Sequence, residues 1–199
     1  MSIKINPNAK ALIFDLDGTL VDSIKTHHKA WQQAISKYNA SFEIEYMFSF
    51  TGKPTVQCAQ QIIDDFKLPV TAPELMKEKE AIFMSTLDQI SLIEPVMNVV
   101  RLHKGKLPMG IATGSDSEIA NTIVQKTGLH EYIQTIVSCD DVENPKPHPE
   151  TFTKCARLLG VHPTECTAFE DGENGMIAAA KAGMEVIDVK PFYDRPVWN

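Results

Sequence analysis

The chain has 199 residues and a formal net charge of −7, with apolar and charged fractions that are ordinary for a globular protein. Its length fits one hydrophobic core with a smaller second domain, and its negative charge argues against nucleic acid and anionic membranes as partners. No apolar run approaches the ~20 residues of a membrane span, and the N-terminal residues lack the apolar stretch of a signal peptide. The four cysteines are scattered without a C-x-x-C pair, which indicates reduced thiols. We therefore expect a cytoplasmic protein in which any bound anion is held by local cations.

The first predicted strand is Ala11–Phe14, a short apolar run. The segment from about Ile24 to Ser91 has no strand alternation and is typical of several amphipathic helices, broken by glycine and proline. It follows the carboxyl end of the first strand, the edge at which open α/β sheets bind ligands. The sequence therefore predicts a helical lid over that edge.

The rest of the chain alternates apolar runs with helical segments, which predicts βα units and a parallel sheet. Further strands are predicted at Met109–Ala112, Thr135–Ser138, Thr167–Phe169 and Val186–Val189. A capping-box pattern at Ser115-Asp116-Ser117-Glu118 marks the start of a helix that ends before Gly128. Two more helices are predicted at Pro149–Gly160 and Asn174–Ala182.

Two carboxylates stand at the end of the first strand, in the sequence Asp15-Leu16-Asp17-Gly18-Thr19. Residues i and i+2 of an extended chain point the same way, so Asp15 and Asp17 share one face. Two carboxylates this close repel each other and favour a divalent cation or a shared proton. A lone D-x-D-G pattern is also common in acidic turns, so it predicts no function by itself.

Three further loops each follow a predicted strand. Thr113-Gly114-Ser115 places a hydroxyl and a glycine at a helix N-terminus, where backbone N–H groups favour an anion. Lys146 lies in a loop with alternating prolines, which stiffen its support. Glu170-Asp171 adds oxygen ligands suited to a hard metal ion. Four such loops in this order, each at the carboxyl end of a strand, indicate an active site.

These residues resemble the four motifs of the haloacid dehalogenase-like superfamily: Asp15-Leu16-Asp17-Gly18-Thr19, Thr113, Lys146-Pro147 and Glu170-Asp171. The helical insertion is similar to the cap of its β-phosphoglucomutase-like branch. The resemblance covers nearly the whole chain. It implies an α/β fold, a Rossmann-like parallel sheet core of residues 1–23 and 92–199 with an inserted α-helical cap domain of residues 24–91. It also implies an aspartyl-phosphate intermediate.

The resemblance also implies the role of each motif residue. Asp15 attacks phosphorus, and Asp17 protonates the leaving group and then activates water. Thr113 and Gly114 bind phosphoryl oxygens, with Ser115 beside them, and Lys146 neutralises their charge. Mg²⁺ is the implied cofactor, and its implied ligands are Asp15, the main-chain carbonyl of Asp17, Asp171 and, through water, Glu170. Ser23 is placed to orient the first motif.

The second aspartate separates related reactions. The resemblance implies that haloalkanoate dehalogenases and phosphonate-cleaving relatives lack the acid–base partner that Asp17 supplies here. A phosphonate-cleaving enzyme would also need a cap lysine, for which Lys53 is a candidate. The presence of Asp17 favours phosphate-ester hydrolysis over both of these reactions.

Cap residues facing the core are expected to set specificity. His27, Lys53 and Lys79 are the candidates for binding substrate, against the alternatives of a solvated helix start and surface lysines. The leading hypothesis is a phosphatase acting on a small phosphorylated metabolite such as a sugar or polyol phosphate. A hexose-phosphate mutase is the alternative, and a catalytically retired binding protein is less favoured because the motif residues are intact. A monomer is expected.

The cap sequence favours the phosphatase over the mutase. A mutase must hold a second phosphate, and arginine is suited to it because its planar group binds phosphate oxygens in pairs. Residues 24–91 contain no arginine, and Thr55 stands near the place where the mutases carry one. Lysines at 53 and 79 leave room for a looser second site, so the mutase stays open as an alternative.

Overall fold

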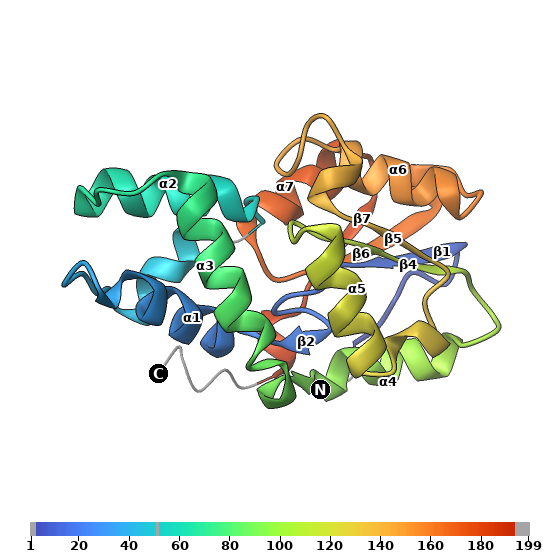
Figure 1. Ribbon diagram of the computed structural model, residues 1–199. Helices are drawn as coiled ribbons and strands as arrows, with labels where there is room; N and C mark the ends of the chain where they lie inside the picture. Colours follow the sequence, from blue (N-terminus) through green and yellow to red (C-terminus); the bar gives the residue numbers. More distant parts are fainter. Residues whose placement is uncertain (1–2, 51, 194–199) are drawn as a thin grey trace.

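The computed structural model describes residues 3–50 and 52–193, and it contains a five-stranded parallel sheet with helices on both faces (Figure 1). The strand order is β5-β4-β1-β6-β7. The strands are β1 Ala11–Phe14, β4 Met109–Ala112, β5 Thr135–Val137, β6 Cys166–Glu170 and β7 Glu185–Asp188. All five predicted strands are confirmed, with ends that differ by no more than one residue. The α/β fold class is confirmed with them.

The central strand β1 is fully buried because both of its faces are covered. Leu12 and Phe14 belong to one hydrophobic cluster, and Ile13 belongs to another on the opposite face. Parallel pairing aligns β1 with β4 on one side and with β6 on the other, so the carboxyl ends of all three strands meet at one edge. The residues that follow these strands are therefore brought together.

The core helices are α4 Glu94–His103, α5 Ser117–Lys126, α6 Glu150–Leu158 and α7 Glu173–Lys181. The three helices predicted after strands are confirmed. The predicted capping box was wrong by one residue, because Asp116 caps α5 and its Oδ1 accepts a hydrogen bond from the Ile119 N–H at 2.9 Å. Ser115 lies outside the helix, where its hydroxyl serves the site described below.

Three α-helices form the insertion between β1 and β4: α1 Ile24–Ser36, α2 Thr55–Phe66 and α3 Ala72–Met84. They share a hydrophobic cluster of their own, which includes Trp31, Phe50 and Leu75. Its helical character is as predicted, while the domain boundaries at residues 23/24 and 91/92 stay a prediction. Figure 1 shows the insertion beside the core, next to the edge at which the strands end.

Two short strands that the sequence analysis missed join the insertion to the core. β2 Val21–Asp22 pairs in antiparallel fashion with β3 Ser91–Leu92, so the two crossing segments of chain lie side by side. Ser91, placed at the end of the predicted cap, therefore belongs to a strand. Two residues are too few to show strand alternation, which explains why the pattern did not reveal them.

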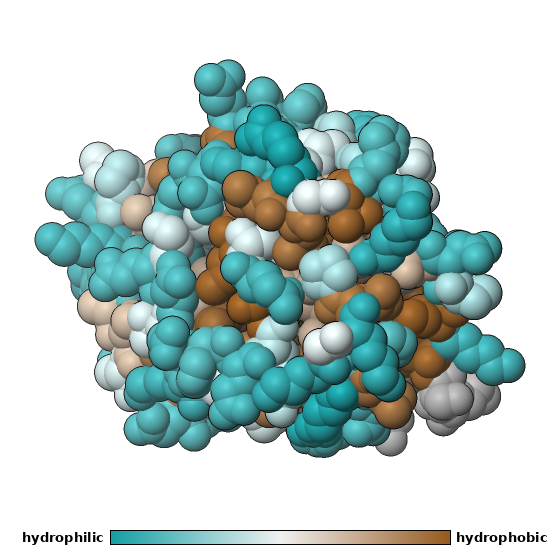
Figure 2. All heavy atoms as spheres, turned by 90° about the vertical axis from the view of Figure 1, so that its right-hand side faces the viewer, coloured by the Kyte–Doolittle hydropathy of each residue, from teal (hydrophilic) through white to brown (hydrophobic). Residues whose placement is uncertain are grey.

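Short 3₁₀ helices connect several of these elements. They are Ile44–Phe50, Leu87–Gln89, Leu129–Glu131, Cys139–Asp141, Pro163–Glu165 and Lys190–Phe192. Among the described residues, no helix has both the length and the apolar character needed to cross a membrane. The face of the core turned away from the insertion carries an apolar band within a hydrophilic surface (Figure 2).

Candidate active site

Lys146 joins the ends of two neighbouring strands. Its ammonium donates to Asp15 Oδ1 at 2.8 Å and to Glu170 Oε1 at 2.6 Å. Asp15 follows β1 and Glu170 ends β6, and all three side chains are buried. Burial alone would lower the pKa of Lys146, but the two carboxylates outweigh it and raise that pKa above its usual range. Lys146 is therefore a fixed positive charge at the edge of the sheet.

Glu170 is held by donors on both of its oxygens. Its Oε2 accepts the backbone N–H groups of Asp171 at 2.8 Å and Gly172 at 2.6 Å, while Oε1 faces Lys146. Helix α7 lies against it without a side chain in the way, since a Cβ on Gly175 would stand 1.6 Å from Glu170 Oε1. This packing fixes the carboxylate that positions Lys146, and it explains why a glycine occupies the first turn of α7.

Asp15, Glu170 and Asp171 form a buried group of carboxylates whose nearest oxygens lie within 4.8 Å of one another. Burial raises the pKa of Asp15 well above its usual value, and the charges of Glu170 and Asp171 raise it further, against the opposing effect of Lys146. The Thr19 hydroxyl donates to Asp171 Oδ1 at 3.0 Å. Three carboxylates this close repel one another, and a hard divalent cation with oxygen ligands fits this group.

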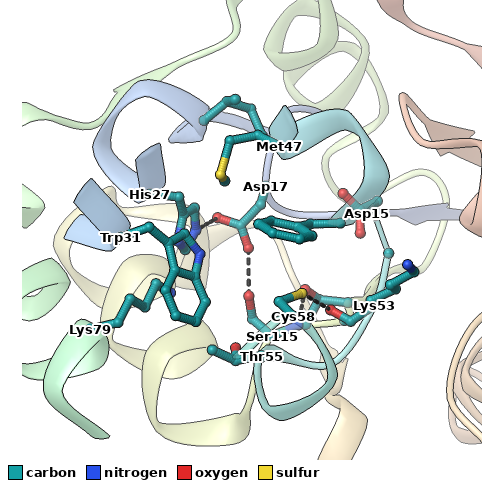
Figure 3. Close-up of a pocket in the computed structure, with 15 residues that line it drawn as sticks. Asp15, Asp17, His27, Trp31, Met47, Lys53, Thr55, Cys58, Lys79 and Ser115 are labelled. Atoms are coloured by element: carbon teal, nitrogen blue, oxygen red, sulfur yellow. Dashed lines mark hydrogen bonds and ion pairs between the residues drawn. The ribbon is translucent and has the colours of Figure 1, made fainter. Parts of the chain in front are cut away.

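Asp17 lies at the wall of the same pocket and receives three hydrogen bonds (Figure 3). Ser23 donates to its Oδ1 at 2.6 Å, His27 Nε2 lies 3.1 Å from the same oxygen, and Ser115 donates to Oδ2 at 2.7 Å. Burial alone would raise the pKa of Asp17, but these hydrogen bonds and the His27 charge hold it well below its usual range. Asp17 is therefore ionised at neutral pH in this structure.

The loop after β4 provides the remaining wall on the core side. Thr113 is buried, and its hydroxyl oxygen accepts the Ser115 N–H at 3.0 Å. The insertion touches this loop, because a Cβ on Gly114 would stand 3.0 Å from the carbonyl oxygen of Gly52. Gly114 thus permits a close approach of the two loops. The insertion is closed over the site.

The pocket between insertion and core has a volume of about 90 Å³. Its core side is polar, and its insertion side combines aromatic and aliphatic groups with three basic side chains. Figure 3 shows Trp31, His27 and Lys79 around Asp17, with Asp15 further along the pocket. The insertion side is lined by Ile24, His27, Trp31, Met47, Phe50, Gly52, Lys53, Thr55, Cys58 and Lys79.

Lys79 of the insertion is buried against aromatic rings. Its side chain is 1% exposed, and its Nζ lies 4.9 Å from the ring centre of Phe83 and 5.5 Å from that of Trp31. Among the described residues, no hydrogen bond or ion pair to this ammonium is formed within contact distance. Burial lowers the pKa of Lys79, against the opposing charges of Glu80 and Asp17. The Lys79 amino group therefore faces the pocket with hydrogen-bonding capacity that the described residues do not use.

His27 connects the insertion to Asp17. Its ring stacks on Phe83 with centroids 3.9 Å apart and planes 7° from parallel. Burial lowers its pKa, as does the charge of Lys79, and the hydrogen bond to Asp17 opposes them. The stacking fixes the plane of the imidazole, so its Nε2 stays aimed at Asp17.

The structure brings the predicted core residues together at one edge, and their chemical roles stay predictions. Of the predicted cap residues, His27 and Lys79 face the pocket. Lys53 lines it, but its ammonium donates to Gln61 Oε1 of α2 at 3.0 Å. Trp31 also lines the pocket and was not predicted as a site residue. It lies four residues after His27, one turn along the same helix face, and that spacing is the signal that could have found it.

No arginine among the described residues lines the pocket. Arg101 pairs with Glu94 at 2.7 Å on α4, Arg157 lies on α6, and Arg195 lies outside the described residues. Thr55, which begins α2, lines the pocket instead. A neutral threonine offers no charge for a second phosphate.

Comparisons with known proteins place this geometry in context. A family model described as haloacid dehalogenase-like hydrolase matches residues 12–189. The chain is 39% identical over 180 residues to the fructose-1-phosphate phosphatase YqaB of Escherichia coli, covering 90% of this chain and 95% of that protein. It is 27% identical over 190 residues to hexitol phosphatase A of the same organism, covering 96% and 87%. The fold also matches β-phosphoglucomutase from Clostridium difficile with a TM-score of 0.78 at 24% identity, covering 89% of this chain and 83% of that one.

Proposed function

Because the chain belongs to the haloacid dehalogenase-like hydrolases, we propose that this phosphatase cleaves the phosphate ester of a small sugar or polyol with Asp15 as its nucleophile. The observation that carries the proposal is that Asp15, paired with Lys146, and Asp17 line one pocket between the insertion and the core. The two phosphatases compared above are named for a sugar phosphate and for hexitols, which supports the same substrate class.

In the first step, a carboxylate oxygen of Asp15 forms a bond to phosphorus while the bond from phosphorus to the ester oxygen breaks. Negative charge on the phosphoryl oxygens is balanced by Lys146, and the Gly114 N–H and the Thr113 hydroxyl are the proposed donors on the other side. The departing alkoxide takes a proton from Asp17. The products are the free alcohol and a phosphorylated Asp15.

Asp17 must carry a proton to act as this acid, although its three donors keep it ionised in the structure. A phosphate dianion bound between Asp15 and Asp17 brings negative charge, which raises the pKa of Asp17. Substrate binding and proton uptake by Asp17 are therefore coupled. After the alcohol leaves, the ionised carboxylate is in the form that the second step needs.

In the second step, Asp17 removes a proton from water, and the water oxygen attacks phosphorus. The bond between phosphorus and the Asp15 oxygen breaks, which releases inorganic phosphate and restores the carboxylate. Each step is one displacement, so a hard reaction is divided into two easier ones.

Mg²⁺ is the cation that we propose for the carboxylate group, held by Asp15, Asp171 and the Asp17 carbonyl, with Glu170 nearby. When bound, it would neutralise charge on the phosphate and keep Asp15 ionised. Hydrogen bonds within the chain orient two of these carboxylates. The Thr19 hydroxyl orients Asp171, and the backbone N–H groups of residues 171 and 172 orient Glu170.

The leaving group lies on the insertion side of the pocket in this proposal. Lys79 is the proposed donor for its hydroxyl oxygens, His27 lines the same side, and the Trp31 ring offers an apolar surface for C–H groups. Because the Lys79 ammonium has no protein partner in the described part of the chain, an oxygen-rich leaving group would supply one.

The proposal is tested by measuring kcat/KM with Mg²⁺ on fructose 1-phosphate, a hexitol phosphate, glycerol 3-phosphate and p-nitrophenyl phosphate. We expect all four to release phosphate, with the polyhydroxylated esters preferred by tenfold or more over p-nitrophenyl phosphate. No phosphate release from any of them would contradict the reaction, and equal kcat/KM values would contradict the substrate class.

The mutase alternative is tested with β-glucose 1-phosphate and a trace of glucose 1,6-bisphosphate. Because no arginine of the described residues lines the pocket, we expect slow phosphate release and little glucose 6-phosphate. Rapid formation of glucose 6-phosphate with little free phosphate would overturn the assignment of hydrolysis.

A further inference from the structure

Two acidic side chains meet where the insertion touches the core, beside the pocket. Glu80 lies on α3 of the insertion, and Asp116 caps α5 of the core. The two carboxyl groups are within hydrogen-bonding reach of each other. Glu80 Oε1 and Asp116 Oδ2 are both buried, and neither receives a hydrogen bond from a donor in the described part of the chain. Carboxylate oxygens only accept, so this contact is a hydrogen bond only when one carboxyl group carries a proton.

The surroundings of Glu80 favour the protonated form. Burial raises the pKa of Glu80 to about 7, and the charges of Asp116 and Asp140 contribute, against the opposing charge of Lys79. Asp116 and Asp140 have other donors, since Asp116 Oδ1 accepts from Ile119 and Asp140 Oδ2 accepts from the N–H and hydroxyl of Ser117. The proton is therefore carried by Glu80.

Two further titratable groups lie near Asp116. One is His27, which is engaged with Asp17, and the other is the Cys139 thiol. Burial and the charge of Asp140 raise the pKa of that thiol to about 12, so it is neutral across the physiological range. Neither group supplies a donor to the orphaned oxygens of Glu80 and Asp116.

This contact bears on access to the pocket. Asp15 is 5% exposed and Lys146 is 2% exposed under the closed insertion, so a substrate reaches them only after the insertion moves away from the core. The contact between Gly52 and Gly114 and the contact between Glu80 and Asp116 both cross the boundary that must open. Attraction between Glu80 and Asp116 therefore favours the closed form of the insertion, and repulsion between them favours the open form.

We propose that Glu80 and Asp116 form a proton-dependent latch that holds the helical insertion closed when they share a proton and favours the open form when they do not. Protonated, the pair is a hydrogen bond across the boundary. Ionised, it is two like charges whose buried oxygens Glu80 Oε1 and Asp116 Oδ2 have no donor among the described residues, and opening lets water solvate both. The latch concerns access to the pocket and goes beyond the proposed reaction.

The sign of the effect follows from linkage. Glu80 has its ordinary pKa of about 4.5 when solvated in the open form and a pKa of about 7 in the closed form. The closed form thus binds the proton more tightly, and its advantage is lost as the pH rises from about 4.5 through about 7. Across that range the ratio of open to closed protein rises on the order of a hundredfold.

Trp31 provides a readout that needs no substrate. It is 2% exposed and lines the pocket, so opening exposes its ring to water. A Trp198→Phe background leaves Trp31 as the sole tryptophan. Acrylamide quenching measured from pH 5 to pH 8.5 on the metal-free protein then reports opening. We expect the quenching constant to rise at least twofold, with a midpoint near the pH at which Glu80 ionises.

The decisive variant is Glu80→Gln, whose amide donates to Asp116 at every pH. It should keep quenching low and flat up to pH 8.5. Glu78→Gln is the matched control on the same helix, where Glu78 pairs with Lys37 inside the insertion, and it should behave as the wild type does. Asp116→Asn is the second variant, since asparagine also caps a helix, and it should flatten the profile too.

Flat quenching in the wild type would overturn the latch. An unchanged pH midpoint in both Glu80→Gln and Asp116→Asn would overturn it as well, because the titration would then belong to another group. If Glu80→Gln failed to fold, the Asp116→Asn profile alone would decide between these outcomes.

Discussion

The two sides of the pocket are built in different ways. On the core side, charged groups are held by partners within the protein: Lys146 bridges Asp15 and Glu170, and Asp17 receives three hydrogen bonds. On the insertion side, Lys79 is buried against aromatic rings without a partner in the described residues. The core side is thus organised before substrate arrives, as catalysis of charge development requires. On the insertion side, the Lys79 amino group has hydrogen-bonding capacity that a substrate would use.

The largest expected effect comes from removing the proposed nucleophile on the core side of the pocket. Asp15→Asn should reduce turnover by at least about a thousandfold, because the amide has nearly the same shape and does not attack phosphorus. The melting temperature in chelator should be unchanged or higher, since burial disfavours the ionised Asp15 carboxylate. Phosphate release and thermal unfolding are the two measurements. Turnover within tenfold of the wild type would refute Asp15 as the nucleophile.

Removing the metal tests the same side without a mutation. Excess chelator should abolish phosphate release, and Ca²⁺ should bind but support little turnover because of its larger, looser coordination. Mg²⁺ should raise the melting temperature of the wild type, and this shift should be lost in Asp171→Asn. Glu173→Gln, at the exposed start of α7, is the control that should keep the shift. Full activity in excess chelator would rule out the metal site.

Lys146→Ala should lower kcat about a hundredfold, since a charge aimed at the transferred phosphoryl group is worth ~3 kcal/mol. It should also destabilise the fold, because it leaves Asp15 and Glu170 buried without their counter-ion. Lys146→Arg should restore little activity, because a planar fork replaces a compact ammonium. A lower melting temperature with an unchanged kcat would make Lys146 structural only.

On the insertion side, removing a buried lysine should stabilise the fold, whereas Lys146→Ala on the core side should destabilise it. Lys79→Met should raise KM for a sugar phosphate about tenfold, with little change for p-nitrophenyl phosphate, whose leaving group offers no hydroxyl. It should also raise the melting temperature at neutral pH, because it removes a buried ammonium without a partner. Lys77→Met is the matched control on the exposed face of α3. An unchanged KM for the sugar phosphate would remove Lys79 from the substrate site.

The dependence of stability on pH gives a second comparison of the wild type with Lys79→Met. The folded-state pKa of Lys79 is lowered below 10.5, so folding releases a proton when Lys79 is charged in the unfolded chain. The free energy of unfolding should therefore rise as the pH increases toward 10.5 in the wild type, and this contribution should vanish in Lys79→Met. Denaturant unfolding at several pH values measures the difference between the two proteins.

The core side of the site could be predicted from the sequence, because its residues stand at or after strands that apolar runs revealed, and parallel strands bring such residues to one edge. These residues are Asp15, Asp17, Thr113, Lys146, Glu170 and Asp171. Most of them stand directly at the end of a strand, while the 3₁₀ helix Cys139–Asp141 separates Lys146 from β5. The same local logic located the helices that follow the strands and the helical character of the insertion.

The insertion side of the pocket and the partner of the Ser115 hydroxyl depend on the tertiary structure. Ser115 has the sequence context of a helix cap, yet its hydroxyl serves Asp17 from 98 positions away. Lys79 and Trp31 come from different helices of the insertion, and Glu80 meets Asp116 across the boundary. No local sequence pattern indicates these contacts. They depend on how two separately packed hydrophobic clusters come together, and not on the period of a helix or a strand.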